Sequence, residues 1–114
     1  MTSCDSGDVV LVHYPFTDMS TLKQRPAVIL SPKGYADRFG DVTLMPLTSQ
    51  PELNAALGLS QWRAAGLIKP SWIKPIVGTL SIRLVQKRLG RLADADVSCV
   101  RAALAMMIAK PWID

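Results

Sequence analysis

The segment DVVLVHY, residues 8–14, is the part of the sequence that decides the fold. It consists almost entirely of β-branched and aromatic residues, which is typical of a β-strand. Successive side chains of a strand point to opposite faces. This alternation places Val9, Leu11 and His13 on one face of the strand. It places Val10, Val12 and Tyr14 on the other face. The next segment, PFTDMSTLKQ (residues 15–24), starts with a proline and predicts a loop.

Two further strands are predicted along the chain. RPAVILSP, residues 25–32, predicts the second strand, and DVTLMPL, residues 41–47, predicts the third. Pro26 has no amide hydrogen, so we expect it at a strand start or at a sheet edge. KGYADRFG, residues 33–40, predicts a turn region between the two strands. TSQPELNAALG, residues 48–58, predicts a loop with a helical turn near its end.

The middle of the chain predicts interrupted elements. SWIKPIVG, residues 71–78, is consistent with a strand that Pro75 interrupts. TLSIRLVQKRLG, residues 79–90, is consistent with a strand or with a short helix. These segments therefore leave the number of strands open.

The C-terminal segment predicts an amphipathic helix. Asp94 or Asp96 is placed to cap it, and we expect the helix to run through Ala109, before Pro111 and Trp112. Its apolar stripe comprises Val97, Val100, Leu104, Met107 and Ile108. Short strands followed by one helix, without βαβ alternation, predict a mainly β fold. We expect a small antiparallel barrel or sheet with one packed helix.

Length and composition restrict the class of protein. With 114 residues, 49% hydrophobic and 19% charged, the chain fits one folded domain, residues 1–114, and not a disordered segment. No run of about 18 apolar residues encodes a membrane span. The N-terminal MTSCDSGDVV lacks the basic start and apolar stretch of a secretory signal. We therefore expect a cytoplasmic protein in which Cys4 and Cys99 are free thiols.

The residue types exclude several kinds of catalytic site. One histidine and two scattered cysteines cannot build a zinc site, so we expect no metal. The sequence contains neither a glycine-rich phosphate loop nor a GxSxG motif. No cofactor is therefore expected.

Positive charge is concentrated in one part of the chain. Residues 53–93 contain seven lysines and arginines and no acidic residue, so this basic block carries +7 and the rest of the chain −3. Such a block attracts polyanions. Trp62 and Trp72 lie within it, and aromatic faces among cations suit single-stranded nucleic acid, whose bases stack on them. The alternative is a solvated surface that keeps the protein soluble.

An ordered series of motifs gives the sequence a family resemblance. GDVVLVHYPFTD, residues 7–18, is followed by QRPAVILSP, residues 24–32, and by DVTLMPLTSQ, residues 41–50. The series continues more loosely through AAGLIKPSWIKP, residues 64–75, and GTLSIRLVQKRLGRL, residues 78–92. In this order and spacing the motifs resemble the PemK/MazF family, the toxins of bacterial type II toxin–antitoxin pairs.

The resemblance implies a fold, an activity and a set of partners. The implied fold is an SH3-like β-barrel that forms a homodimer. The implied activity is growth inhibition by a metal-independent endoribonuclease that cuts single-stranded RNA such as mRNA. The implied partners are a cognate antitoxin, whose tail wraps the dimer groove and neutralises the toxin, and operator DNA, bound through the antitoxin complex.

The resemblance also implies which residues act. The arginine of the family's Arg-Pro motif corresponds to Arg25, and the threonine of its Pro-x-Thr motif corresponds to Thr48. RNA can cleave itself when its 2′-hydroxyl attacks the neighbouring phosphate, and charge then develops on the phosphate oxygens. The guanidinium of Arg25 can bind those oxygens with two parallel hydrogen bonds, and the hydroxyl of Thr48 can bind the same phosphate. Further residues are expected to contact the substrate: His13, Asp18, Ser49, Gln50 and Lys74.

Structural interpretations of these residues remain open. Arg25 could be a surface residue whose stem covers the barrel edge, and Thr48 could be a strand terminus. Asp18 could hold its loop through hydrogen bonds to the backbone. A lone histidine at a strand end, such as His13, could likewise be structural.

One departure from the family bears on the mechanism. Many ribonucleases of the family carry an acidic residue where this chain has Ser71 and Trp72, so a carboxylate general base is missing. Either His13 or a bound water would then take the proton, or the cleavage rate is low, or this branch of the family acts differently. The alternative function is a non-catalytic SH3-like module that binds nucleic acid or protein, or a growth inhibitor acting on another target.

Overall fold

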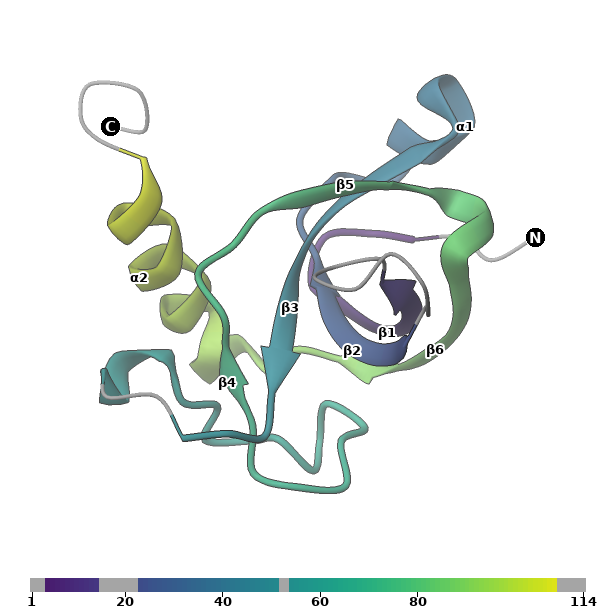
Figure 1. Cartoon of the computed structure of the whole chain (residues 1–114). Helices are drawn as coiled ribbons and strands as arrows, with labels where there is room; N and C mark the ends of the chain where they lie inside the picture. Colours follow the sequence, from purple (N-terminus) through teal and green to yellow (C-terminus); the bar gives the residue numbers. More distant parts are fainter. Residues whose placement is uncertain (1–3, 15–22, 52–53, 109–114) are drawn as a thin grey trace.

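The computed structural model of the chain describes residues 4–14, 23–51 and 54–108 (Figure 1). The elements in chain order are β1 (Asp8–Tyr14), β2 (Lys23–Ile29), α1 (Tyr35–Phe39), β3 (Asp41–Thr48), η1 (Ala55–Leu57), β4 (Trp72–Ile73), β5 (Gly78–Ser81), η2 (Ile82–Leu84), β6 (Val85–Arg91), η3 (Asp94–Asp96) and α2 (Val97–Met107). The prediction of a mainly β fold with a C-terminal helix is confirmed.

The strands form one antiparallel, barrel-like sheet. Its order is β4-β3-β2-β1-β6, and β5 pairs with β3 beside this path. Strand β3 is shared, because β5 pairs with Asp41–Leu44 and β4 pairs with Leu47 and Thr48. The short η2 leads from β5 into β6, so the sheet curls round (Figure 1). No pairing between β5 and β6 closes the barrel within the described residues.

The strand alternation predicted for residues 8–14 is confirmed by two separate core clusters. Val9 belongs to the cluster between the sheet and α2, whereas Val10, Val12 and Tyr14 belong to the cluster enclosed by the curled sheet. We call these the helix-side core and the barrel core. Each also contains a buried free cysteine, Cys99 in the first and Cys4 in the second. Burial is the main cause that raises the pKa of both thiols.

The three predicted strands and the interrupted middle agree with the structure, with two corrections. Strand β2 starts at Lys23, inside the predicted loop, and ends at Ile29 and not at Pro32. Residues 33–40 are not only a turn, because they contain the short helix α1. Residues 71–78 are interrupted as expected, since β4 ends at Ile73 and β5 starts at Gly78. Pro26 faces Leu11 of β1, and the pairing of β2 with β3 begins only at Ala27. Pro26 therefore lies where β2 is an edge on that side.

The predicted C-terminal helix needs two corrections. Helix α2 ends at Met107 and not at Ala109. Its buried residues are Cys99 and Ala103, whereas Val97 from the predicted stripe is 38% exposed. Val97 starts the helix, and the buried residues Cys99 and Ala103 follow further along it.

The predicted cap of this helix is right in position, since Asp96 is the N-cap residue, but wrong in its contact. Asp96 stands at the N-cap position, but its side chain makes no cap hydrogen bond. Its carboxylate accepts hydrogen bonds from the amide and hydroxyl of Ser60, both at 2.8 Å, and from the amide of Gln61 at 2.9 Å. Asp96 therefore ties two distant segments together and does not close its own helix.

Gly66→Ala is expected to destabilise the fold by about 2 kcal/mol. Gly66 has a φ of +87°, and a Cβ there would overlap the carbonyl oxygen of Leu89 in β6. Backbone must then shift on one side of this contact. Thermal or urea unfolding measures the loss.

Gly34→Ala is the matched control for this contact. Gly34 has a similar φ of +93°, but a Cβ there would have no neighbour within 4 Å. Only the left-handed conformation is then penalised, at about 1 kcal/mol. Equal losses in the two variants would show that the contact of residue 66 with β6 does not matter.

Candidate nucleic-acid interface

Arg25 stands near the start of β2, opposite Val12 of β1. Its side chain is exposed. It makes no hydrogen bond or ion pair with any residue in the part of the chain that the structure describes. Because a guanidinium stays charged at any working pH, Arg25 presents an uncompensated cation to an anionic ligand.

Thr48 ends β3 and is half-buried. Its Oγ1 accepts a hydrogen bond from the amide of Gln50 at 3.1 Å, which is a local turn of the kind that threonine favours. A hydroxyl can accept and donate at once, so the Thr48 proton remains available to a phosphate oxygen. The exposed Ser49 and Gln50 follow directly and lie at the same strand end.

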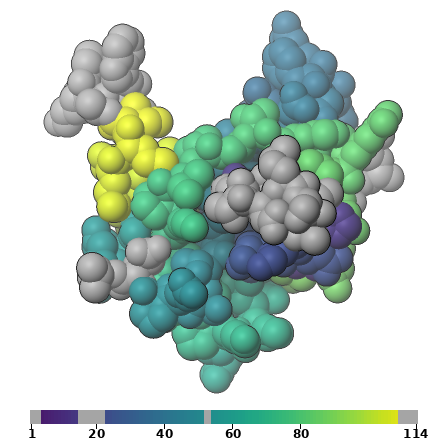
Figure 2. All heavy atoms as spheres, viewed as in Figure 1, coloured from purple at the N-terminus to yellow at the C-terminus, as the bar shows by residue number. Residues whose placement is uncertain are grey.

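The sheet register brings Arg25 and Thr48 to the same place. β2 pairs with β3 through Ala27↔Pro46, Val28↔Met45 and Ile29↔Leu44. The observed pairs end at Ala27↔Pro46; the same register, extended by two residues beyond them, would set Arg25 opposite Thr48. Residues opposite each other in an antiparallel pair project from the same face. Figure 2 shows the start of β2 (dark blue) and the end of β3 (blue-teal) on the same face of the molecule.

Strand β4 extends this arrangement by one strand. Thr48 pairs with Trp72, and the amide of Lys74 donates to the carbonyl of Pro46 at 2.9 Å. Trp72 and Lys74 alternate with the buried Ile73, so they share the face of Thr48. We call Arg25, Thr48 and Trp72 the cross-strand row, with the exposed Lys74 beside it.

His13 lies apart from this row. It pairs with Gln24, one residue away from the Val12–Arg25 pair, and so projects from the opposite face of the sheet. Its two ring nitrogens contact the side-chain nitrogens of Gln24 at 3.3 Å and of Gln86 at 3.4 Å. The structure therefore does not bring His13 together with Arg25 and Thr48. Asp18 lies outside the described residues.

Ser71 and Trp72 lie in the region where many family members carry an acidic residue. Ser71 is buried and its hydroxyl donates to the carbonyl of Lys69 at 2.9 Å, which is a structural contact. Trp72 stands opposite Thr48. Neither residue supplies a carboxylate, so the row offers cationic, hydroxyl and aromatic groups only.

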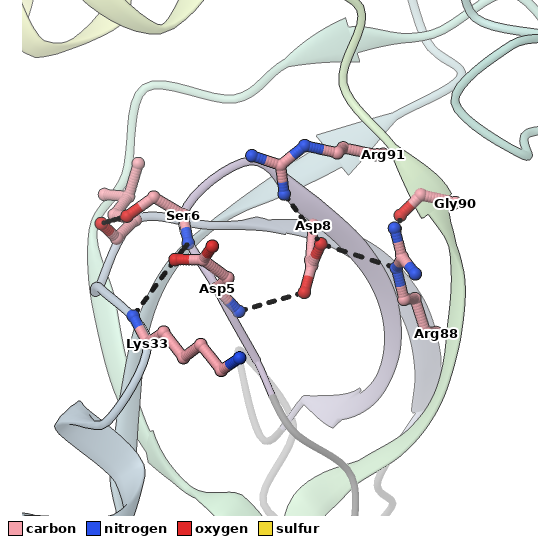
Figure 3. A network of polar contacts seen from close by, with 8 residues as sticks. Asp5, Ser6, Asp8, Lys33, Arg88, Gly90 and Arg91 are labelled. Carbon is pink, nitrogen blue, oxygen red and sulfur yellow. Dashed lines mark hydrogen bonds and ion pairs between the residues drawn. The ribbon is translucent and has the colours of Figure 1, made fainter.

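Part of the basic block is neutralised inside the protein (Figure 3). Oδ1 of the buried Asp8 accepts a hydrogen bond from Nη1 of Arg91 at 3.1 Å, and Nε of Arg88 lies 3.4 Å from the same oxygen. The other Asp8 oxygen accepts from the amide of Asp5 at 2.9 Å. Arg88 and Arg91 of the block therefore have an acidic partner from outside it, and the positive potential is smaller than the sequence alone suggests.

Other candidate sites carry less chemistry. No cluster of three or more metal-ligating side chains occurs within residues 4–14, 23–51 and 54–108. No helix in these ranges is long and apolar enough to span a membrane. A cavity of about 300 Å³ between α2 and the sheet contains none of the predicted site residues. Its apolar lining includes Val28, Leu30, Leu92, Val97, Val100 and Leu104.

The cross-strand pairing of Trp72 with Thr48 was not predicted from the sequence. Strand β4 has only two residues, which is too short to show alternation. The available signal was the departure from the family pattern at Ser71 and Trp72, which marked the position without showing its neighbour.

Solved structures of similar fold are numerous. The MazF structure from Deinococcus radiodurans superposes with a TM-score of 0.73 at 21% identity, over 93% of this chain and 96% of that one. An endoribonuclease from a mycobacterial species gives 0.72 at 20% identity, over 98% and 97%. A mycobacterial endoribonuclease in complex with its cognate antitoxin gives 0.67 at 18%, over 93% of both chains. At these identities the likeness shows the fold alone.

The sequence comparisons give the family. No curated protein matches the chain. The family model described as PemK-like, MazF-like toxin of type II toxin-antitoxin system matches residues 5–108, which is most of the chain. The chain therefore belongs to the PemK-like, MazF-like family of toxins of type II toxin–antitoxin systems.

Proposed function

We propose that this toxin is a metal-independent endoribonuclease that cuts single-stranded RNA, with Arg25 and Thr48 as its catalytic residues. The observation that carries the proposal is the register of β2 and β3, which sets these two side chains on one face at one strand end. The absence of any partner for the Arg25 guanidinium among the described residues supports it. Membership of the toxin family also supports the proposal. So does the name of a mycobacterial neighbour of similar fold, which is an endoribonuclease.

The proposed reaction needs no covalent intermediate on the protein. The RNA 2′-hydroxyl loses its proton, its oxygen bonds to the adjacent phosphorus, and the bond from phosphorus to the 5′-oxygen breaks. Arg25 binds two non-bridging oxygens as their charge rises, and Thr48 donates its hydroxyl proton to one of them. Among the described residues, His13 projects from the other face and Ser71 is buried, so the proposal assigns to water both the removal of this proton and the protonation of the leaving oxygen.

The partners follow from the same proposal. A cognate antitoxin would neutralise the toxin; a mycobacterial endoribonuclease of similar fold was solved in complex with its own cognate antitoxin. A homodimer of single-domain chains, a cytoplasmic location and operator DNA bound through the antitoxin complex remain predictions. So do substrate contacts by Ser49, Gln50 and Lys74.

One observation favours a second function. The cross-strand row contains no carboxylate, and Ser71 and Trp72 occupy the region where many family members carry one. A row of cationic, hydroxyl and aromatic groups can bind a nucleic acid strand without cutting it. The alternative is therefore a binding module that acts through the same face.

Incubation with a long single-stranded RNA in EDTA tests the proposal. Fragments with 2′,3′-cyclic phosphate and 5′-hydroxyl ends are expected, because no metal takes part and the 2′-oxygen is the nucleophile. A DNA strand of the same sequence serves as the control and stays intact, since it lacks that hydroxyl. Intact RNA that is nevertheless tightly bound would favour the binding module, and cleavage only with added divalent metal would contradict the mechanism.

A further inference from the structure

We infer that Trp72 stacks on a base of the bound strand and thereby helps to choose the position of the cut. The inference rests on the proposed function, because it takes the cross-strand row as the surface on which RNA lies. It goes beyond that function by assigning base recognition to one side chain.

The geometry of the row is the first argument. Trp72 pairs directly with Thr48, and the continued register sets Arg25 on the other side of Thr48. Paired strands lie about 4.8 Å apart, so the extended register would set the Cα atoms of Arg25 and Trp72 roughly 10 Å apart. A strand whose phosphate is held by Arg25 therefore has a neighbouring base within reach of the indole.

The surroundings of the indole are the second argument. Trp72 is half-buried, yet neither core cluster includes it. Gly58 forms a bridge with Trp72, and a Cβ on Gly58 would lie only 3.0 Å from the indole Nε1. The ring is thus held against a residue without a side chain. Such a fixed ring loses little conformational freedom when a base stacks on it.

The comparison with Trp62 is the third argument. Trp62 lies in the same basic block, but it packs against the helix-side core. The guanidinium of Arg63 already covers its ring, at 4.7 Å from the centroid. Trp72 makes no such cation–π contact within the described residues. Of these two rings, Trp72 is the one that remains available to a base.

The inferred contact has a consequence for specificity. Every base has an aromatic face, so stacking tolerates all four bases and favours those with the larger ring overlap. We therefore expect a broad preference for purines at the nucleotide that contacts Trp72. A relative that reads the same nucleotide through hydrogen bonds would be more selective.

Binding to strands that cannot be cut tests the inference apart from catalysis. The probe is a labelled single-stranded deoxyadenylate of about 12 nucleotides, a length comparable to known binding sites for single strands. Trp72→Leu is expected to bind it about tenfold more weakly than the natural protein in fluorescence anisotropy. Trp72→Phe keeps a ring and is expected to lose threefold or less. Trp62→Leu, the matched control, is expected to keep the affinity of the natural protein.

A second probe removes the bases instead of the indole. An abasic strand of the same length keeps the phosphates but has no bases to stack. The natural protein should therefore bind it more weakly than deoxyadenylate. Trp72→Leu should bind the abasic strand with the same affinity as the natural protein does. Equal losses by Trp72→Leu on both probes would overturn the inference, as would unchanged binding of deoxyadenylate. If Trp72→Leu fails to fold, Trp72→Phe and the two probes on the natural protein decide. If RNA stays intact in the cleavage assay but Trp72→Leu still weakens the binding of deoxyadenylate, the nuclease proposal is wrong and the stacking contact stands.

Discussion

Arg25→Ala is expected to slow RNA cleavage by at least about 100-fold, because one well-placed electrostatic donor is worth roughly 3 kcal/mol in the transition state. The free energy of unfolding should be nearly unchanged. Arg25 is exposed and has no partner among the described residues, and surface substitutions of this kind change stability by about 0.5 kcal/mol or less. Initial cleavage rates in EDTA and thermal unfolding of the same samples measure both effects.

Two further variants separate charge from geometry. Arg25→Lys keeps the charge but loses the paired hydrogen bonds, so its rate should lie between those of the natural protein and Arg25→Ala. Arg101→Ala removes an exposed arginine from α2, outside the row, and should cleave RNA at the natural rate. Full activity of Arg25→Ala would remove this arginine from the mechanism. Equal losses in Arg101→Ala would mean that only net charge matters.

The parts of the fold that were predictable are those whose pattern lies within one short segment. Residues 8–14 show their alternation directly, and the two cores confirm it. That alternation already separates His13 from Val12, the residue that faces Arg25. Helix α1 was missed because none of its residues is buried, so no apolar period marks it. Its ends are set by the left-handed Gly34 and Gly40.

The site depended more on pairing than on pattern. The resemblance selected Arg25 and Thr48, but only the register of β2 and β3 shows that they share a face. The partner of Thr48 on its other side, Trp72, could not be predicted from a strand of two residues. Pairing between distant segments is a tertiary property, which local sequence patterns do not contain.

Asp96→Ala is expected to destabilise the protein by about 3 kcal/mol, which lowers the unfolding temperature by roughly 10 °C. The carboxylate is 2% exposed and accepts three hydrogen bonds from Ser60 and Gln61, a residue pair 35 to 36 positions away. Removal leaves these donors without their charged acceptor. Asp94→Ala is the control, because Asp94 belongs to the same η3 but is exposed. Its unfolding temperature should stay within about 2 °C of the natural protein.

The same substitution should also weaken the row. Asp96 holds Ser60, and the preceding Leu59 donates its amide to the carbonyl of Ser71 at 2.9 Å, directly before Trp72. When the segment around Leu59 and Ser60 loosens, the indole of Trp72 becomes more mobile. The proposed contact with a base needs this indole in a fixed position. Asp96→Ala should therefore bind deoxyadenylate more weakly than Asp94→Ala at a temperature where both are folded. A stability loss without a change in affinity would show that β4 is held by its pairing with β3 alone.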